Sequence, residues 1–198
     1  AVNTVIIDPD GQTTGENTDG KGFVKAISEM TSIPGKKIVI FGAGGAARAI
    51  AVEMALAEAE EITILNVSER GKSLADLLNN RTPAKASFRP WNRTFSIPSD
   101  TDIVINATPV GLYPDIEQRL NIRVDTLRPQ MIVADCIPNP VYTHLLKDAL
   151  ANGCKQILPG MNMLIYQAMI AIKYWTGKDV DTDIMKQELM RVLGLLKQ

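Results

Sequence analysis

Residues 37–47 read Lys37-Ile-Val-Ile-Phe-Gly-Ala-Gly-Gly-Ala-Ala47, an apolar run that passes directly into a glycine-rich turn. The continuous apolar run predicts a strand that is buried on both faces, because a half-exposed strand would alternate apolar with polar residues. The turn fits the pattern G-x-G-x-x-A: Gly42 allows the tight turn, Gly44 leaves room for a pyrophosphate, and Ala47 allows close helix packing. The N–H groups of the following helix would face the phosphates. The alternative is a strand–helix turn that binds nothing.

The alternation of strand and helix continues along the chain. Further apolar runs of strand length lie at 61–65, 85–88, 102–106, 131–135 and 156–158. Segments of helical period lie between them at 45–60, 70–80 and 142–152. This order predicts an α/β fold with a doubly wound, mostly parallel sheet of Rossmann type, flanked by helices. Outside it we expect a strand at 4–7, a turn at 8–11, and helices at 21–30, 162–176 and 181–196.

Composition and charge narrow the classes of function. The 198 residues carry 21 basic and 22 acidic side chains, a formal net charge of −1. That balance argues against a nucleic-acid partner and against a membrane-binding patch, since both need excess positive charge. The two cysteines, Cys136 and Cys154, are too few for a disulfide framework or a four-ligand zinc site, so we expect no metal. Reduced thiols are typical of a cytoplasmic protein.

The end of the second predicted strand bears on which dinucleotide binds. An NAD site usually places Asp or Glu there to accept from the ribose 2′-hydroxyl, whereas residues 66–72 read Asn-Val-Ser-Glu-Arg-Gly-Lys. Neutral Asn66 followed by Ser68 and Arg70 would suit the 2′-phosphate of NADP, and Glu69 would favour NAD. We therefore favour NADP and keep NAD as the alternative. Arg70 would otherwise belong to a solvated helix face.

Five ordered motifs run along nearly the whole chain. They are Asn3-Thr4 with Glu16-Asn-Thr-Asp-Gly20, the glycine turn, Asn106-Ala-Thr-Pro-Val-Gly111, Asp135-Cys-Ile-Pro-Asn-Pro140 with Thr143, and Gly160-Met-Asn-Met-Leu164 with Gln167. Together they resemble the shikimate and quinate/shikimate dehydrogenase family. The resemblance implies an NADP-dependent oxidoreductase that reversibly reduces 3-dehydroshikimate to shikimate, in aromatic amino acid and chorismate biosynthesis. The implied partner is a small hydroxy acid, and a homodimer stays open.

The resemblance also implies a role for each matching residue. Asn3, Asp19 and Gln167 would bind substrate hydroxyls, and Asp19 would pair with a lysine in an acid–base dyad that delivers a proton to the developing alkoxide. The implied cofactor-binding residues are Gly42, Ala43, Gly44, Gly45, Ala46, Asn66, Ser68, Arg70, Asn106, Thr108, Pro109, Gly160 and Met163. Structural alternatives remain for three of these residues: Asp19 can cap a helix, Gln167 can be an ordinary helix residue, and Asn106 can close a strand-end turn.

The chain departs from the family pattern in three ways. The family's catalytic lysine and paired substrate-binding serines lie upstream of the Asn3 motif, so the chain resembles a cofactor domain without most of the substrate domain. Val67 stands where the family often has arginine. Pro138 stands where the family usually has tyrosine, and Asn162 where glycine or proline is more usual. Neither Lys21 nor Lys25 is assigned the catalytic role.

These observations suggest a division of the chain. Residues 1–20 would be the remnant of the substrate domain and its link, and residues 21–198 the dinucleotide-binding domain. Its C-terminal helices would pack toward a missing N-terminal domain. We expect this chain to bind dinucleotide and to be inactive or weakly active alone. The alternative functions are a quinate/shikimate dehydrogenase that uses NAD and a non-catalytic nucleotide-binding regulatory module.

Overall fold

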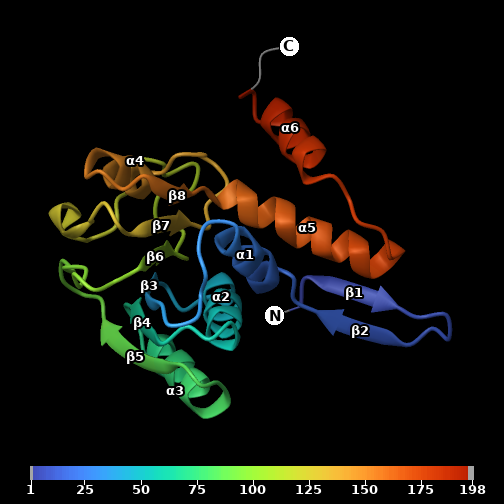
Figure 1. Ribbon diagram of the computed structural model, residues 1–198, viewed down its shortest axis with the longest axis horizontal. Helices are drawn as coiled ribbons and strands as arrows, with labels where there is room; N and C mark the ends of the chain where they lie inside the picture. The colour runs from blue at the N-terminus through green and yellow to red at the C-terminus, as the bar shows by residue number, and fades with distance from the viewer. Residues whose placement is uncertain (1, 196–198) are drawn as a thin grey trace.

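A computed structural model describes residues 2–195 and has a six-stranded sheet at its centre (Figure 1). The strands are β3 (Lys37–Phe41), β4 (Glu61–Asn66), β5 (Lys85–Pro90), β6 (Ile103–Asn106), β7 (Ile132–Asp135) and β8 (Gln156–Leu158). They lie in the order β5-β4-β3-β6-β7-β8, and every neighbouring pair is parallel. The predicted doubly wound parallel sheet is therefore confirmed, and the strand order reverses between β3 and β6, where such folds bind ligands.

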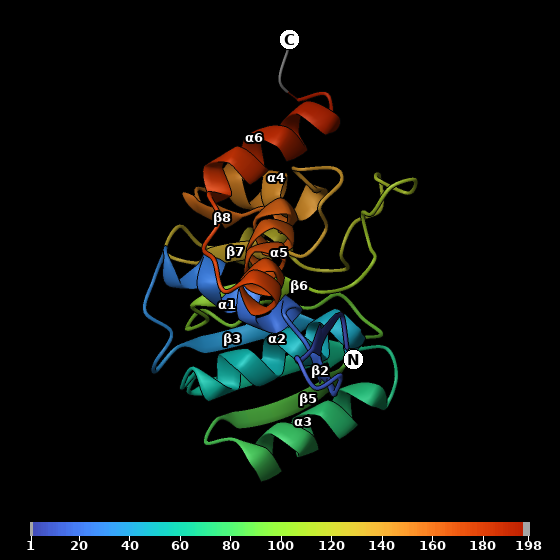
Figure 2. The ribbon, with the colours of Figure 1, turned by 90° about the vertical axis from the view of Figure 1, so that its right-hand side faces the viewer.

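Helices cover both faces of this sheet. The helices of residues 2–195 are α1 (Asp19–Ser28), α2 (Gly45–Leu56), α3 (Arg70–Arg81), α4 (His144–Ala151), α5 (Gly160–Thr176) and α6 (Thr182–Val192), with a short 3₁₀ turn, η1 (Val124–Thr126). Side chains of α1, α2 and α3 pack on one face of the strands, and those of α4 pack on the other. Figure 2 shows α5 lying beside α1, with which it makes extensive contact.

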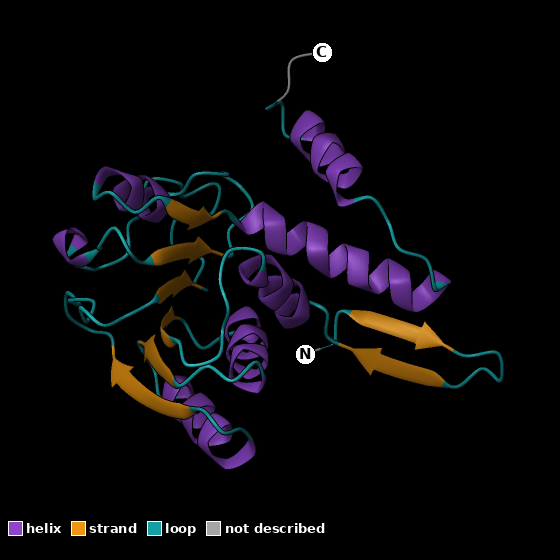
Figure 3. Cartoon of the chain, in the orientation of Figure 1, coloured by secondary structure: helices purple, strands orange, loops and turns teal. Residues whose placement is uncertain are grey.

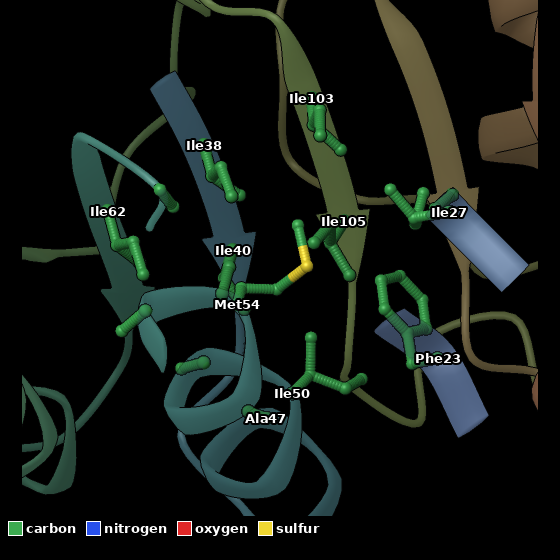
Figure 4. Close-up of a cluster of buried hydrophobic side chains, with 14 of the residues drawn as sticks. Phe23, Ile27, Ile38, Ile40, Ala47, Ile50, Met54, Ile62, Ile103 and Ile105 are labelled. Carbon is green, nitrogen blue, oxygen red and sulfur yellow. The ribbon is translucent and has the colours of Figure 1, made fainter. Parts of the chain in front are cut away.

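The main core explains why the central strands are apolar throughout. Alternate isoleucines of β3 and β6 point to the same side, where Phe23 of α1 and Met54 of α2 lie fully buried against them (Figure 4). The intervening residues, such as Val39 and Phe41, fill a second cluster beneath α4. Because both sides of each strand are buried, no polar alternation survives in the sequence.

The N-terminal part forms a hairpin that projects from the body (Figure 3). The predicted strand at 4–7 is confirmed as β1 (Thr4–Ile7), and it pairs antiparallel with β2 (Thr13–Glu16), which the sequence analysis missed. The residues of β2 read Thr-Thr-Gly-Glu and give no apolar alternation. Trp175 near the end of α5 donates its indole N–H to Val5 O of the hairpin at 2.8 Å.

The helix ends that differ most from the sequence-based prediction are those of α2 and α6. The helix expected to reach residue 60 ends at Leu56, and Glu58 then takes a left-handed φ of 66° that turns the chain toward β4. The last helix begins as expected, with the Asp181 carboxylate capping the N–H groups of Asp183 and Ile184. It ends at Val192, however, and not at the expected residue 196, and Gly194 then takes a left-handed φ of 69°. Across residues 2–195, no helix combines the length and the apolar character that a membrane crossing requires.

Candidate active site

The glycine turn lies at the carboxyl end of β3, at the point where the strand order reverses. Gly42 has a φ of +109°, and a Cβ built on it would lie 2.6 Å from Ala107 O, so both the backbone angle and the close approach require glycine. Its N–H donates to Leu65 O at 2.7 Å, which ties the turn to β4. The turn is thus held between β4 and the loop that follows β6.

The next two glycines face open space. A Cβ built on Gly44 or Gly45 would meet no atom within 4 Å. Gly44 is the N-cap of α2, and no side chain of the described residues caps this helix. The N–H groups of the first turn of α2 are therefore available as donors beside open space, as a pyrophosphate site requires. The residues present fit a dinucleotide.

A small hollow connects this turn to the N-terminal motif. It has a volume of about 140 Å³ and is lined by Asn17, Gly45, Arg48, Ala49, Val52 and Glu53. Asn17 belongs to the Glu16–Gly20 motif and Gly45 to the glycine turn, so two motifs that are separate in sequence share one depression.

The end of β4 forms the corner where an adenosine ribose would lie. The Asn66 side-chain amide donates to Ser68 O at 3.0 Å and to Ser68 Oγ at 2.9 Å, so the two predicted residues form one turn. Val67 between them is 79% exposed, and Arg70, the first residue of α3, is also exposed. Their contact with a cofactor stays a prediction.

The three predicted substrate residues meet although up to 164 residues separate them. Asn3 Nδ2 donates to Asp19 Oδ1 at 2.9 Å and lies 3.5 Å from Gln167 Oε1. The Thr18 N–H donates to Asn3 Oδ1 at 2.9 Å, which fixes the orientation of that amide. Asn3 therefore presents its NH₂ group toward the carboxylate, and the cluster offers both donors and acceptors.

Thr18 is a site residue that the sequence analysis missed. It is fully buried, and its hydroxyl accepts from Asn3 Nδ2 at 3.0 Å and lies 3.2 Å from Gln167 Oε1. Its signal in the sequence is its place between Asn17 and Asp19 of the Glu16–Gly20 motif. Packing alone does not require a polar side chain at a buried position, so a buried threonine there points to a hydrogen-bonding role. Its hydroxyl thus bridges the side-chain amides of Asn3 and Gln167.

A close helix contact positions Gln167. A Cβ built on Gly22 of α1 would lie 2.5 Å from the Gln167 backbone N, so α5 approaches α1 only because residue 22 has no side chain. The Gln167 side chain also donates from Nε2 to Leu164 O at 3.1 Å. The second N–H of Nε2 is not used in this bond and is available for a substrate hydroxyl.

Gly22→Ala is expected to lower the free energy of unfolding by about 2 kcal/mol, because the added methyl would push α5 away from α1. Gly45→Ala, also in a helix, is the matched control: its Cβ would meet nothing within 4 Å, so its effect should be neutral or stabilising. Urea denaturation of the two variants measures the difference. Equal stabilities would contradict the close contact.

Two further motifs meet at the ends of β6 and β7. Asn106 and Asp135 are register partners on these strands, and both are fully buried. Asn106 Nδ2 donates to the Asp135 carboxylate at 3.1 Å and 3.2 Å, and Asn106 Oδ1 accepts from the Thr108 hydroxyl at 2.7 Å. Burial raises the pKa of Asp135 to about 6. The Asn106 side chain is thus occupied within the protein, and contact of Asn106, Thr108 or Pro109 with a cofactor stays a prediction.

Known proteins resemble this chain in both sequence and structure. The family model for the "Shikimate 5'-dehydrogenase C-terminal domain" matches residues 160–190. A shikimate dehydrogenase (NADP(+)) of Methanothermobacter thermautotrophicus is 37% identical over 195 residues, which cover 98% of this chain and 68% of the relative. The chain belongs to the shikimate dehydrogenase family. The resemblance drawn from the five motifs is therefore confirmed.

Two solved structures of this family's fold lie close to the chain. The 5-ketofructose reductase of Gluconobacter sp. strain CHM43 has a TM-score of 0.92 and 45% identity, covering 97% of this chain and 69% of its own. A shikimate 5-dehydrogenase from Listeria monocytogenes in complex with shikimate and NAD has a TM-score of 0.87 and 36% identity, covering 96% of this chain and 68% of its own. The chain thus spans about two thirds of the length of these dehydrogenase relatives.

In this member of the shikimate dehydrogenase family, the lysines that follow Asp19 most closely in sequence have other partners. Lys21 Nζ donates to Glu16 Oε2 at 2.8 Å and to the Tyr174 hydroxyl at 2.9 Å, contacts that raise the pKa of Lys21. Lys25 Nζ lies 4.0 Å from Glu29 Oε1. These contacts give no support for assigning either lysine to an acid–base dyad with Asp19.

The positions that depart from the family pattern lie on two loops and one helix start. Pro138 is half-buried in the loop after β7, and Asn162 lies in the first turn of α5, where its N–H donates to Pro159 O at 3.1 Å. Gly160 and Met163 of the same turn are buried. Within residues 2–195, no three His, Cys, Asp or Glu side chains gather where they could hold a metal ion.

Proposed function

We propose that the chain is the cofactor-binding part of an NADP-dependent oxidoreductase that reversibly reduces 3-dehydroshikimate to shikimate. The observation that carries this proposal is the meeting of Asn3 with Asp19 and Gln167, to both of which the Asn3 amide donates, on the side of the molecule that also bears the glycine turn. The Methanothermobacter relative, named for NADP(+), supports the cofactor assignment.

The residues of this cluster suit a vicinal polyol. An amide both donates and accepts, so Asn3 and Gln167 each match one substrate hydroxyl, and the Asp19 carboxylate accepts from another. When bound, NADPH supplies the hydride. The chain's own part is to hold the pyrophosphate on the α2 N-terminus and to keep the polyol ring oriented against that cofactor.

Asp19 is the proposed acid–base residue. A carboxylate that pairs with an ammonium group keeps it charged and oriented toward the developing alkoxide. Asp19 accepts from Asn3 here, while Lys21 is bonded to Glu16 and Lys25 lies 4.0 Å from Glu29. We therefore propose that residues 1–198 alone bind dinucleotide and turn over weakly or not at all.

The test is a steady-state assay of the full-length protein with shikimate and NADP. Asp19→Asn is expected to lower kcat by roughly 100-fold or more, as loss of an acid–base group does. Asp10→Asn, an exposed carboxylate in the hairpin turn, is the matched control and should leave the rate unchanged. Full activity of Asp19→Asn would reject the proposed role.

The dinucleotide preference has its own measurement. Titration of NADPH and NADH against residues 1–198 should show tighter binding of NADPH, because the end of β4 carries the neutral Asn66–Ser68 turn where an NAD site usually has Asp or Glu. Ser68→Ala should weaken NADPH more than NADH. Tighter NADH binding would instead support the quinate and NAD alternative, and binding without any turnover by the full-length protein would support a regulatory module.

Reduction of a neutral keto sugar is a second candidate. Identity to the Gluconobacter 5-ketofructose reductase is 45%, against 36% to the Listeria shikimate 5-dehydrogenase. Pro138 also replaces a tyrosine of the family pattern with a residue that has no polar side-chain atom. The cluster of Asn3, Thr18, Asp19 and Gln167 holds no cation for a substrate carboxylate, and it would bind a neutral polyol equally well.

One assay separates the two substrates. The ratio of kcat/KM for 5-ketofructose to that for 3-dehydroshikimate is measured with NADPH on the same full-length preparation. A ratio above about 100, equivalent to roughly 3 kcal/mol of transition-state binding, would assign the protein to keto-sugar reduction. A ratio below one would retain the shikimate assignment. Pro138→Tyr should move the ratio toward the carboxylate substrate in either case.

We also propose a cytoplasmic location. Cys136 and Cys154 are both free, and burial raises the pKa of each thiol. Thiols that remain protonated and unpaired are typical of a reducing compartment.

A further inference from the structure

Asp135 is a fully buried carboxylate that the proposed reaction does not use. Its oxygens accept from Asn106 Nδ2 at 3.1 Å and 3.2 Å, from the Thr143 hydroxyl at 2.7 Å and from the Ile137 N–H at 2.9 Å. All these donors are neutral. A buried carboxylate without a cation is costly, so an apolar residue would serve packing better at this position.

These hydrogen bonds join two loops at the carboxyl ends of β6 and β7. The first loop, residues 106–111, is held through Asn106, whose Oδ1 accepts from the Thr108 N–H at 3.0 Å and the Thr108 hydroxyl at 2.7 Å. The second loop, residues 136–143, is held through Ile137 and Thr143. One carboxylate therefore sets the position of both loops.

Each loop supports a part of the candidate site. Ala107 O of the first loop is the atom that a Cβ on Gly42 would meet at 2.6 Å, so this loop lies directly against the glycine turn. Backbone atoms of Cys136 and Ile137 in the second loop lie where a Cβ on Gly160 would be, so this loop lies against the start of α5, which carries Gln167. A shift of either loop would reach the site.

We propose that Asp135 is a positioning residue for the nicotinamide half of the cofactor. In a doubly wound sheet the two halves of a dinucleotide lie on opposite sides of the switch point, and the adenosine half lies over the half that carries the glycine turn. Here β3 and β4 form the adenosine side, so β6 and β7 form the nicotinamide side. Asp135 sets the two loops that border this second side.

This inference rests on the proposed dinucleotide site and is tested by two probes on residues 1–198. NADPH spans both halves of the site, whereas 2′,5′-ADP occupies the adenosine half alone. Asp135→Asn should weaken NADPH binding by at least tenfold, because its NH₂ group would face the donors of Asn106 and Thr143. Affinity for 2′,5′-ADP should change by less than threefold. Titrations of both probes at pH 7.5 measure this split.

Milder variants and a control keep the test decisive. Thr143→Val removes one donor and should weaken NADPH several-fold, and Thr143→Ser, which keeps the hydroxyl, should bind as the parent does. Leu78→Ala, a fully buried change toward the far end of α3, lowers stability without touching either loop and should alter neither probe. If Asp135→Asn does not fold, the Thr143 pair decides the question.

The outcomes are separable from those of the proposed function. If the parent chain binds neither probe, the dinucleotide site itself is rejected. If the parent binds both probes and the Asp135 and Thr143 variants bind NADPH equally well, or lose both probes alike, only the positioning role is rejected.

Discussion

Gly42→Ala is expected to lower the free energy of unfolding by roughly 3 kcal/mol and to abolish dinucleotide binding. The φ of +109° is strained for any residue with a Cβ, and the new methyl would lie 2.6 Å from Ala107 O. Strain of this kind costs about 1–3 kcal/mol. The overlap with Ala107 O adds to this cost, because Ala107 follows Asn106, whose side chain is held by Asp135 and Thr108. Urea denaturation and NADPH titration of the same preparation measure the two effects.

Two other glycines separate backbone strain from the loss of space. Gly11 has a φ of +80° in the hairpin turn with nothing near its Cβ position, so Gly11→Ala should cost only the strain, about 1 kcal/mol, and leave NADPH binding unchanged. Gly44 has an ordinary φ of −79° and an open Cβ position, so Gly44→Ala should fold normally. Its methyl would occupy the space proposed for the pyrophosphate, and binding should fall at least tenfold.

The variants test both the close approach of Gly42 to Ala107 and the proposed position of the pyrophosphate. If Gly42→Ala folds with near-normal stability, the close approach to Ala107 is not rigid. If Gly44→Ala binds NADPH as tightly as the parent, the space beside α2 is not where the pyrophosphate lies.

The centre of the parallel sheet could be predicted from the sequence because β3, β6 and β7 are buried on both faces. A short, continuous apolar run such as that of β3, followed directly by a glycine-rich turn, indicates a strand that is buried on both faces. The glycine turn also indicates which end of the strand faces the ligand. The hairpin strand β2 could not be found in this way, since Thr13–Glu16 is exposed along almost its whole length and carries no alternation. Short polar strands are specified by their partner rather than by their own sequence.

Motifs in the sequence indicate candidate site residues, but they do not show the contacts that join distant strands. Motifs indicate Asn3, Asp19 and Gln167. In the structure Asn3 donates to Asp19, and the Thr18 hydroxyl bridges Asn3 and Gln167. The bond between Asn106 and Asp135 was not foreseen, because the two residues are 29 positions apart and become neighbours only through the register of β6 with β7. Pairing between strands is set by the whole sheet, so a local pattern cannot show it.

Ionisation of Asp135 should leave a signature in the pH dependence of stability. Burial raises the pKa of this carboxyl from its ordinary value of 3.8 to about 6 in the folded protein. Between these values the folded state binds the proton more tightly than the unfolded state does, so the contribution of Asp135 to stability falls as the pH rises. The fall amounts to about 3 kcal/mol, is complete just above pH 6, and stays constant at higher pH.

The difference in unfolding free energy between the parent chain and Asp135→Asn isolates this contribution. Exposed carboxyls such as Asp100 and Glu117, whose pKa values are lowered by Lys37 and His144, titrate in both proteins and cancel. The neighbouring Cys136 thiol has a raised pKa and stays neutral throughout this range. Urea denaturation at intervals from pH 4 to pH 8 should therefore show the parent losing about 3 kcal/mol relative to Asp135→Asn by pH 7. A constant difference, or one that grows in favour of the parent, would contradict this prediction. It would mean that the neutral donors around Asp135 compensate fully for its burial, so that the buried carboxylate does not lower the stability.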